Sequence, residues 1–92
     1  MDAIFKALGD PVRLVIVDEL VARNDQSLFE IVTRLVMTHG FSISRQAVSK
    51  HLSVLEGAGL VQIDRVGRTT MHRLNTEALA SARAWLTERT ES

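Results

Sequence analysis

The chain has 92 residues, 46% of them hydrophobic and 24% charged, which is the composition of one folded domain with a small core. It contains no cysteine, and this excludes disulfides, thiolate nucleophiles and every metal site built on cysteine. Its 11 basic residues are balanced by 11 acidic ones, so the positive excess common in nucleic-acid-binding proteins is missing.

Two helices are predicted at the start of the chain. Residues 1–8 carry apolar side chains at helical spacing and end at Gly9, and a helix this short must dock on another surface. Asp10 is suited to the N-cap of a second helix, and Pro11 to its first turn. We expect this second helix to continue to about residue 22.

A third helix is predicted after a polar turn at residues 24–26. Ser27 and Glu30 have the spacing of a capping box, in which each side chain binds the backbone of the other residue. The apolar stripe that follows continues to about Met37, and Gly40 ends the segment.

A fourth helix is predicted over residues 45–56, with Ser42 or Ser44 as its N-cap. One face of this helix is apolar. The opposite face is polar and carries no acidic side chain before Glu56, and it consists of Gln46, Ser49, Lys50 and Ser53. This polar face is either an ordinary solvated surface or a binding surface.

A β-hairpin and a last helix complete the predicted elements. Residues 60–64 and 69–74 alternate in the manner of two strands, and residues 65–68 form the tip between them. Gly67 is suited to a positive φ in this turn. The last helix is predicted over residues 75–89.

The order α-α-α-α-β-β-α is that of a winged helix-turn-helix, a mainly α-helical fold with a small β-hairpin wing, formed here by one domain of residues 1–92. A recognition helix enters the major groove with its N-terminal turn first, so we expect Arg45 and Gln46 to reach base edges. The other predicted contacts, to phosphates, a second base or the neighbouring groove, are Ser49, Lys50, Arg65 and Arg68. The two wing arginines have an alternative role in keeping a strand edge soluble.

Three stretches of the sequence resemble the ArsR family of winged-helix repressors. Residues 7–13, ALGDPVR, are similar to the family's opening A-L-x-D-P-T-R, with Val12 in place of the usual threonine. Residues 47–61, AVSKHLSVLEGAGLV, resemble its recognition helix and first wing strand. Residues 67–68 and 73–74 resemble the rest of the wing.

The resemblance implies an obligate homodimer, built from the helices at residues 1–9 and 75–89, that binds operator DNA until a signal releases it. It also implies a DNA-facing set in the recognition helix, namely Ser44, Arg45, Gln46, Ser49, Lys50 and His51. His51 lies between the polar and apolar faces, so a structural hydrogen bond is an equal alternative. Residues 36–43 are longer than the family's usual turn, so either the helix pair is separated or the third helix is extended.

The thin core and the short first helix favour a dimer interface over packing within one subunit. The residues expected there are Ile4, Phe5, Leu8, Leu79, Ala82, Trp85 and Leu86. Family members that sense metals use a cysteine at the start of the third helix or a His/Asp set in the last helix. Residues 28–30 and the histidine-free last helix supply neither, so we expect no metal site and no cofactor.

The expected partners are double-stranded operator DNA and a second copy of the chain. The alternative is a winged helix that binds another protein, because a neutral chain lacks the long-range field that attracts DNA. No phosphate-binding loop or catalytic arrangement predicts an enzyme. The effector is left open between a small apolar ligand, a partner protein and none. No apolar run approaches the roughly 18 residues that span a bilayer, and no export signal begins the chain, so we expect a cytoplasmic location.

Overall fold

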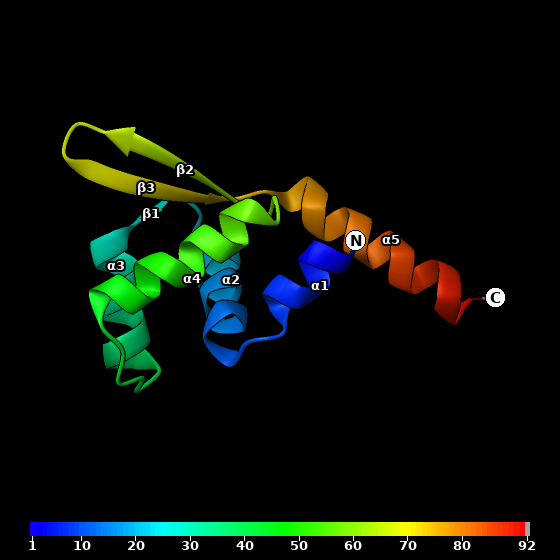
Figure 1. Cartoon of the computed structure of the whole chain (residues 1–92), viewed down its shortest axis with the longest axis horizontal. Helices are drawn as coiled ribbons and strands as arrows, with labels where there is room; N and C mark the ends of the chain where they lie inside the picture. The colour runs from blue at the N-terminus through cyan, green and yellow to red at the C-terminus, as the bar shows by residue number, and fades with distance from the viewer. Residues whose placement is uncertain (92) are drawn as a thin grey trace.

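A computed structural model describes residues 1–91 of the chain (Figure 1). Its elements are α1 Asp2–Leu8, α2 Pro11–Ala22, β1 Gln26–Ser27, α3 Leu28–Thr33, the π-helical turn η1 Arg34–Thr38, α4 Arg45–Gly57, β2 Val61–Val66, β3 Thr69–Leu74 and α5 Thr76–Thr90. The predicted winged helix-turn-helix order is confirmed, with β1 and η1 as additions. None of the helices in the described part is long and apolar enough to cross a membrane.

Side-chain caps fix where the helices begin. The Asp10 carboxylate accepts hydrogen bonds from two N–H groups of the first turn of α2. Ser27 and Glu30 form the predicted capping box, with distances of 3.1 Å and 3.0 Å. Ser44 caps α4 and Asn75 caps α5. Each cap satisfies an N–H group that has no partner inside its helix.

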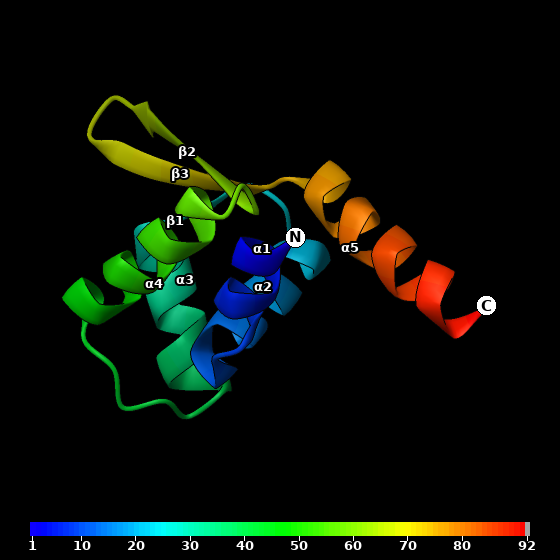
Figure 2. The same ribbon diagram turned by 45° about the vertical axis from the view of Figure 1, so that its right-hand side comes forward.

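The core lies among α2, α3, α4 and the base of the sheet (Figure 2). Its fully buried aliphatic side chains are Ile16, Leu20, Ile31, Leu35, Val48, Leu52, Leu55 and Leu60. By contrast, α5 extends away from this body, and Ala82 is its one buried residue within the described chain. The core is therefore built without most of the last helix.

The sheet has three strands rather than the two that we predicted. Its order is β1-β3-β2, with both pairings antiparallel. The prediction of a polar turn at residues 24–26 was wrong for Gln26, which is fully buried in β1 opposite His72. The Gln26 side-chain nitrogen donates to the Glu19 and Arg23 carbonyl oxygens, each at 2.9 Å, and so holds β1 against the end of α2.

The hairpin turn is shorter than predicted. Arg65 and Val66 belong to β2, so the turn itself consists of Gly67 and Arg68. Gly67 has a φ of +63°, as the first central residue of a two-residue hairpin turn requires. The wing is consequently a regular ladder up to its tip.

The longer segment between the third and fourth helices extends the third helix. Helix α3 runs directly into η1, where the His39 N–H donates to the Arg34 carbonyl oxygen at 3.2 Å. The buried Glu19 carboxylate of α2 accepts from Arg34 Nε at 2.9 Å and from His39 Nε2 at 2.8 Å. These two bonds satisfy a buried charge and fasten the extension to the core.

We expect the free energy of unfolding to fall in two steps as the solution is acidified. Burial lowers the pKa of His72, so below about pH 6.5 the unfolded chain binds a proton that the folded chain does not, and stability is lost. The hydrogen bond from His39 lowers the pKa of Glu19, so the stability that its ionised form provides is lost below about pH 4.3. Denaturant unfolding between about pH 8 and 2 covers both steps.

A matched variant separates the two steps. His72→Gln should remove the loss that begins below about pH 6.5 and keep the loss that begins below about pH 4.3. An unchanged dependence in the upper range would show that His72 does not cause it.

Candidate nucleic-acid interface

Helix α4 has the two faces that its sequence predicts. Its apolar face, formed by Val48, Leu52 and Leu55, is buried against the core. Its polar residues Gln46, Ser49, Lys50 and Ser53 are all exposed, and so is Arg45 at its first position. The Ser44 hydroxyl caps the helix by accepting the Ala47 N–H at 3.1 Å. The polar face is therefore free to meet a ligand with its N-terminal end foremost.

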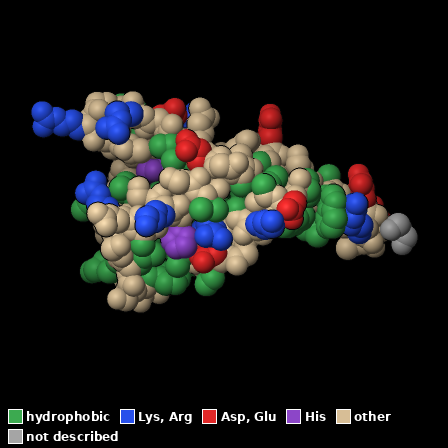
Figure 3. Space-filling model, in the orientation of Figure 1, with side chains coloured by type: hydrophobic (Ala, Val, Ile, Leu, Met, Phe, Trp, Pro, Cys, Tyr) green, Lys and Arg blue, Asp and Glu red, His purple; other side chains and the backbone are tan. Residues whose placement is uncertain are grey.

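Positive charges on this side of the molecule lack the acidic partners that most basic residues have elsewhere. Arg45, Lys50, Arg65 and Arg68 form no salt bridge within residues 1–91. Of the other seven basic residues, five form one: Lys6, Arg13, Arg34, Arg73 and Arg89. Figure 3 shows positive side chains that project from the wing and from the side below it. Four basic side chains without an acidic partner thus lie on this side of a neutral chain, and the wing also carries Asp64.

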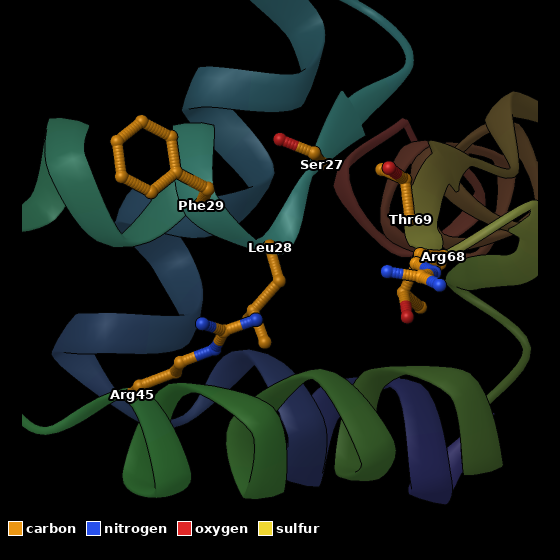
Figure 4. Close-up of a pocket in the computed structure, with 7 residues that line it drawn as sticks. Ser27, Leu28, Phe29, Arg45, Arg68 and Thr69 are labelled. Atoms are coloured by element: carbon orange, nitrogen blue, oxygen red, sulfur yellow. The ribbon is translucent and has the colours of Figure 1, made fainter.

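A cleft separates the wing from the start of α4. It has a volume of about 170 Å³, and we call it the wing cleft; its lining residues are Ser27, Leu28, Phe29, Arg45, Arg68, Thr69 and Thr70. Arg45 extends from the start of α4 toward Leu28 (Figure 4), and Arg68 of the wing is another lining residue of the same cleft. The structure therefore brings together one predicted residue of the recognition helix and one of the wing.

His51 has a structural partner. Its side chain is half-buried, and its Nδ1 accepts a hydrogen bond from the Arg13 guanidinium at 3.1 Å. The same guanidinium donates to the Ala7 carbonyl oxygen at 2.6 Å and lies 4.0 Å from the Asp10 carboxylate. The alternative of a structural hydrogen bond is present in the molecule, and a DNA contact by His51 stays a prediction.

The residues predicted for a dimer interface come together on α1 and α5 within one subunit. The rings of Phe5 and Trp85 are 5.3 Å apart, centroid to centroid. Ile4, Leu8 and Leu79 are partly buried against the core. Trp85 and Leu86 remain 37% and 49% exposed, so the pair of helices still offers an apolar surface to a partner.

Other residues of this surface could not be found from the sequence. Ser27, Leu28, Thr69 and Thr70 line the wing cleft although they lie far from the recognition helix in the chain. Only the fold brings them near Arg45, and no spacing in the sequence signals it. Within the described residues, no group of three or more His, Asp or Glu side chains is placed to hold a metal ion.

The exposed recognition helix, the wing beside it and the core beneath them define a winged helix-turn-helix protein. A family model described as a helix-turn-helix domain matches residues 8–63. The chain is 49% identical over 86 residues to the HTH-type transcriptional regulator YuzN of Bacillus subtilis, covering 92% of this chain and 94% of the relative. It is 31% identical to the transcriptional repressor SdpR of the same organism, covering 94% and 88%.

Solved structures agree with the sequence relatives. An ArsR-like transcriptional regulator from Rhodococcus sp. RHA1 superimposes with a TM-score of 0.76 at 36% identity, over 98% of this chain and 79% of that one. The chain therefore belongs to the ArsR family of winged helix-turn-helix transcriptional regulators, as a member without cysteine. It is a DNA-binding regulator and not an enzyme.

Proposed function

We propose that the protein is a homodimeric repressor that binds an inverted-repeat operator through α4 and the wing. The observation that carries this proposal is the set of four basic side chains on that side, none of them in a salt bridge within the described chain. Unpaired Lys and Arg side chains can replace the counterions of DNA phosphates, which supplies most of the affinity. A repressor role is supported by the likeness to SdpR.

The proposed contacts follow from position and chemistry. Gln46 lies in the first turn of α4, and its amide matches the major-groove edge of adenine. Lys50 is suited to phosphate, and the wing arginines to the neighbouring groove or its backbone. Contacts by Ser44, Ser49 and His51 complete the proposed set, together with Arg45, Arg65 and Arg68.

A second copy of the chain is the proposed occupant of the α1 and α5 surface. Helix α5 has 15 residues yet buries only Ala82 within the described subunit, and it packs mainly on a short helix. A two-fold pairing here would cover Trp85 and Leu86 and place the two recognition helices in successive major grooves, about 34 Å apart. We place this activity in the cytoplasm of a bacterial cell, where operator DNA is found.

Trp85→Ala is expected to weaken dimerisation by at least about 30-fold, because a large aromatic side chain would be lost from both halves of the interface. Arg83→Ala, an exposed change on the same helix, should leave dimerisation unaltered. Sedimentation equilibrium over a range of concentrations measures both variants, with circular dichroism as the check of folding. Equal dimer dissociation constants for Trp85→Ala and wild type would contradict the proposed interface.

Selection from a pool of random duplex DNA tests the proposed function. An enriched inverted repeat, with half-sites about one helical turn apart, is expected at near-physiological salt. If the folded protein enriches no motif, the result would contradict the proposed operator binding and favour a winged helix that binds another protein.

A further inference from the structure

We infer that a single phosphate of the DNA backbone is bound in the wing cleft, held jointly by Arg45 of α4 and Arg68 of the wing. This inference rests on the proposed function and adds to it a binding site for one chemical group. It also assigns Arg45 to the backbone, whereas the sequence predicted a base contact.

The shape of duplex DNA gives the first step of the argument. A sugar-phosphate strand separates each major groove from the adjacent minor groove. A protein that inserts a helix into the major groove and a wing into the minor groove must therefore straddle this strand. In this protein the wing cleft lies between the start of α4 and the tip of the hairpin (Figure 4).

The lining of the cleft gives the second step. Its two charged residues are guanidinium groups from different elements, and a guanidinium presents a fork of donors that matches phosphate oxygens. The hydroxyl groups of Ser27, Thr69 and Thr70 add polar atoms, and Leu28 offers an apolar surface for a deoxyribose. No acidic residue lines the cleft among the described residues.

The acidic group nearest in sequence to this lining does not cancel the charge. The Glu30 carboxylate accepts the Ser27 N–H at 3.0 Å within the capping box. Neither Arg45 nor Arg68 forms a salt bridge with it or with any other acid in residues 1–91. A phosphate in the cleft would therefore meet two guanidinium groups that have no acidic partner, and its negative charge is attracted to both.

The orientation of Arg45 gives the third step. Its side chain runs toward Leu28 and the wing (Figure 4), so it points to the side of the groove where the strand passes. Gln46, the next residue along α4, is then left as the side chain of the first turn that faces the bases. Arg45 therefore contributes to affinity for all sequences, and Gln46 contributes to the choice of sequence.

The experiment measures how binding to a fixed duplex of mixed sequence depends on salt, for wild type, Arg45→Gln, Arg68→Gln and the double variant. Each phosphate neutralised by the protein contributes about 0.9 to the slope of log K against log salt concentration. If the two arginines share one phosphate, the slope of the double variant should be smaller than that of wild type by about 0.9 per bound subunit. The loss of affinity in the double variant should also be smaller than the product of the losses in the two single variants.

The control pair is Lys50→Gln with Arg68→Gln. These residues lie on different parts of the surface, so we expect their slope changes to add to about 1.8 per subunit and their affinity losses to multiply. The same result for Arg45→Gln and Arg68→Gln, with slope changes that add and affinity losses that multiply, would overturn the shared phosphate. It would leave the proposed function intact as long as wild type binds the duplex. No binding of wild type to any duplex would overturn the proposed function itself.

A second arm separates the DNA strand from a free phosphate compound as the source of the bound group. Inorganic pyrophosphate is titrated by calorimetry into DNA-free wild type and into the double variant. We expect no saturable binding in either, because one phosphate site needs the other contacts of the strand. Saturable binding to wild type that the double variant loses would overturn the strand as the natural occupant.

Discussion

Gln46→Ala is expected to weaken binding to the selected operator by about 30-fold or more and to leave binding to random duplex nearly unchanged. A bidentate contact from glutamine to adenine is worth about 1 to 3 kcal/mol of discrimination against the wrong base. A dimer makes this contact twice, once in each half-site, so the two losses add. Fluorescence anisotropy with the operator and with a scrambled duplex at one salt concentration measures the difference.

Two other exposed residues provide the controls for Gln46. Lys50→Ala lies one turn further along α4 and should weaken operator and scrambled duplex by similar factors, because a phosphate contact carries no sequence information. Arg83→Ala lies on α5, away from the proposed DNA surface, and should change neither. Equal losses of Gln46→Ala on both duplexes would assign Gln46 to the backbone as well.

Leu52→Ala is expected to lower the free energy of unfolding by about 2 to 5 kcal/mol, because it leaves a cavity where α4 packs on the core. Leu52 is 1% exposed, and its neighbours in the core come from several elements. A small domain has only about 5 to 15 kcal/mol of stability in total, so this change removes a large share of it.

The matched control for Leu52 is Val54→Ala on the same helix. Val54 is 46% exposed, so the loss of its two methyl groups should change the free energy of unfolding by no more than about 0.5 kcal/mol. Urea unfolding followed by circular dichroism gives both values. A loss below about 1 kcal/mol for Leu52→Ala would show that α4 is not held by this contact.

Much of the fold depends on interactions between residues close together in the sequence, and these could be predicted. The Asp10 cap, the capping box of Ser27 and Glu30, and the Ser44 cap all act within one helical turn. The two faces of α4 are likewise visible in the sequence, since buried and exposed side chains alternate at helical spacing. The family model and the solved structures confirm the predictions of a winged helix-turn-helix fold and of ArsR membership.

The features that the sequence did not reveal depend on contacts between distant segments. Strand β1 has two residues, too few for a periodic pattern, and it exists because Gln26 pairs with His72 of β3. The sequence left open whether the helix pair is separated or the third helix is extended, and the extension is fixed by Glu19 of α2, which binds Arg34 and His39. The wing cleft combines residues from three separate segments, so its lining follows only from the fold.

The hydrogen bonds of Arg13 bear on how strictly the protein can measure the distance between two half-sites. This one side chain joins the end of α1, through the Ala7 carbonyl oxygen, to His51 in the middle of α4. In the proposed dimer the recognition helices would thus be fixed relative to the two-fold axis without a flexible joint. One base pair added between the half-sites increases their separation by about 3.4 Å and rotates one relative to the other by about 35°. A dimer with fixed recognition helices could not adjust to this change. The length of the operator's spacer would then be as much a part of its identity as its bases.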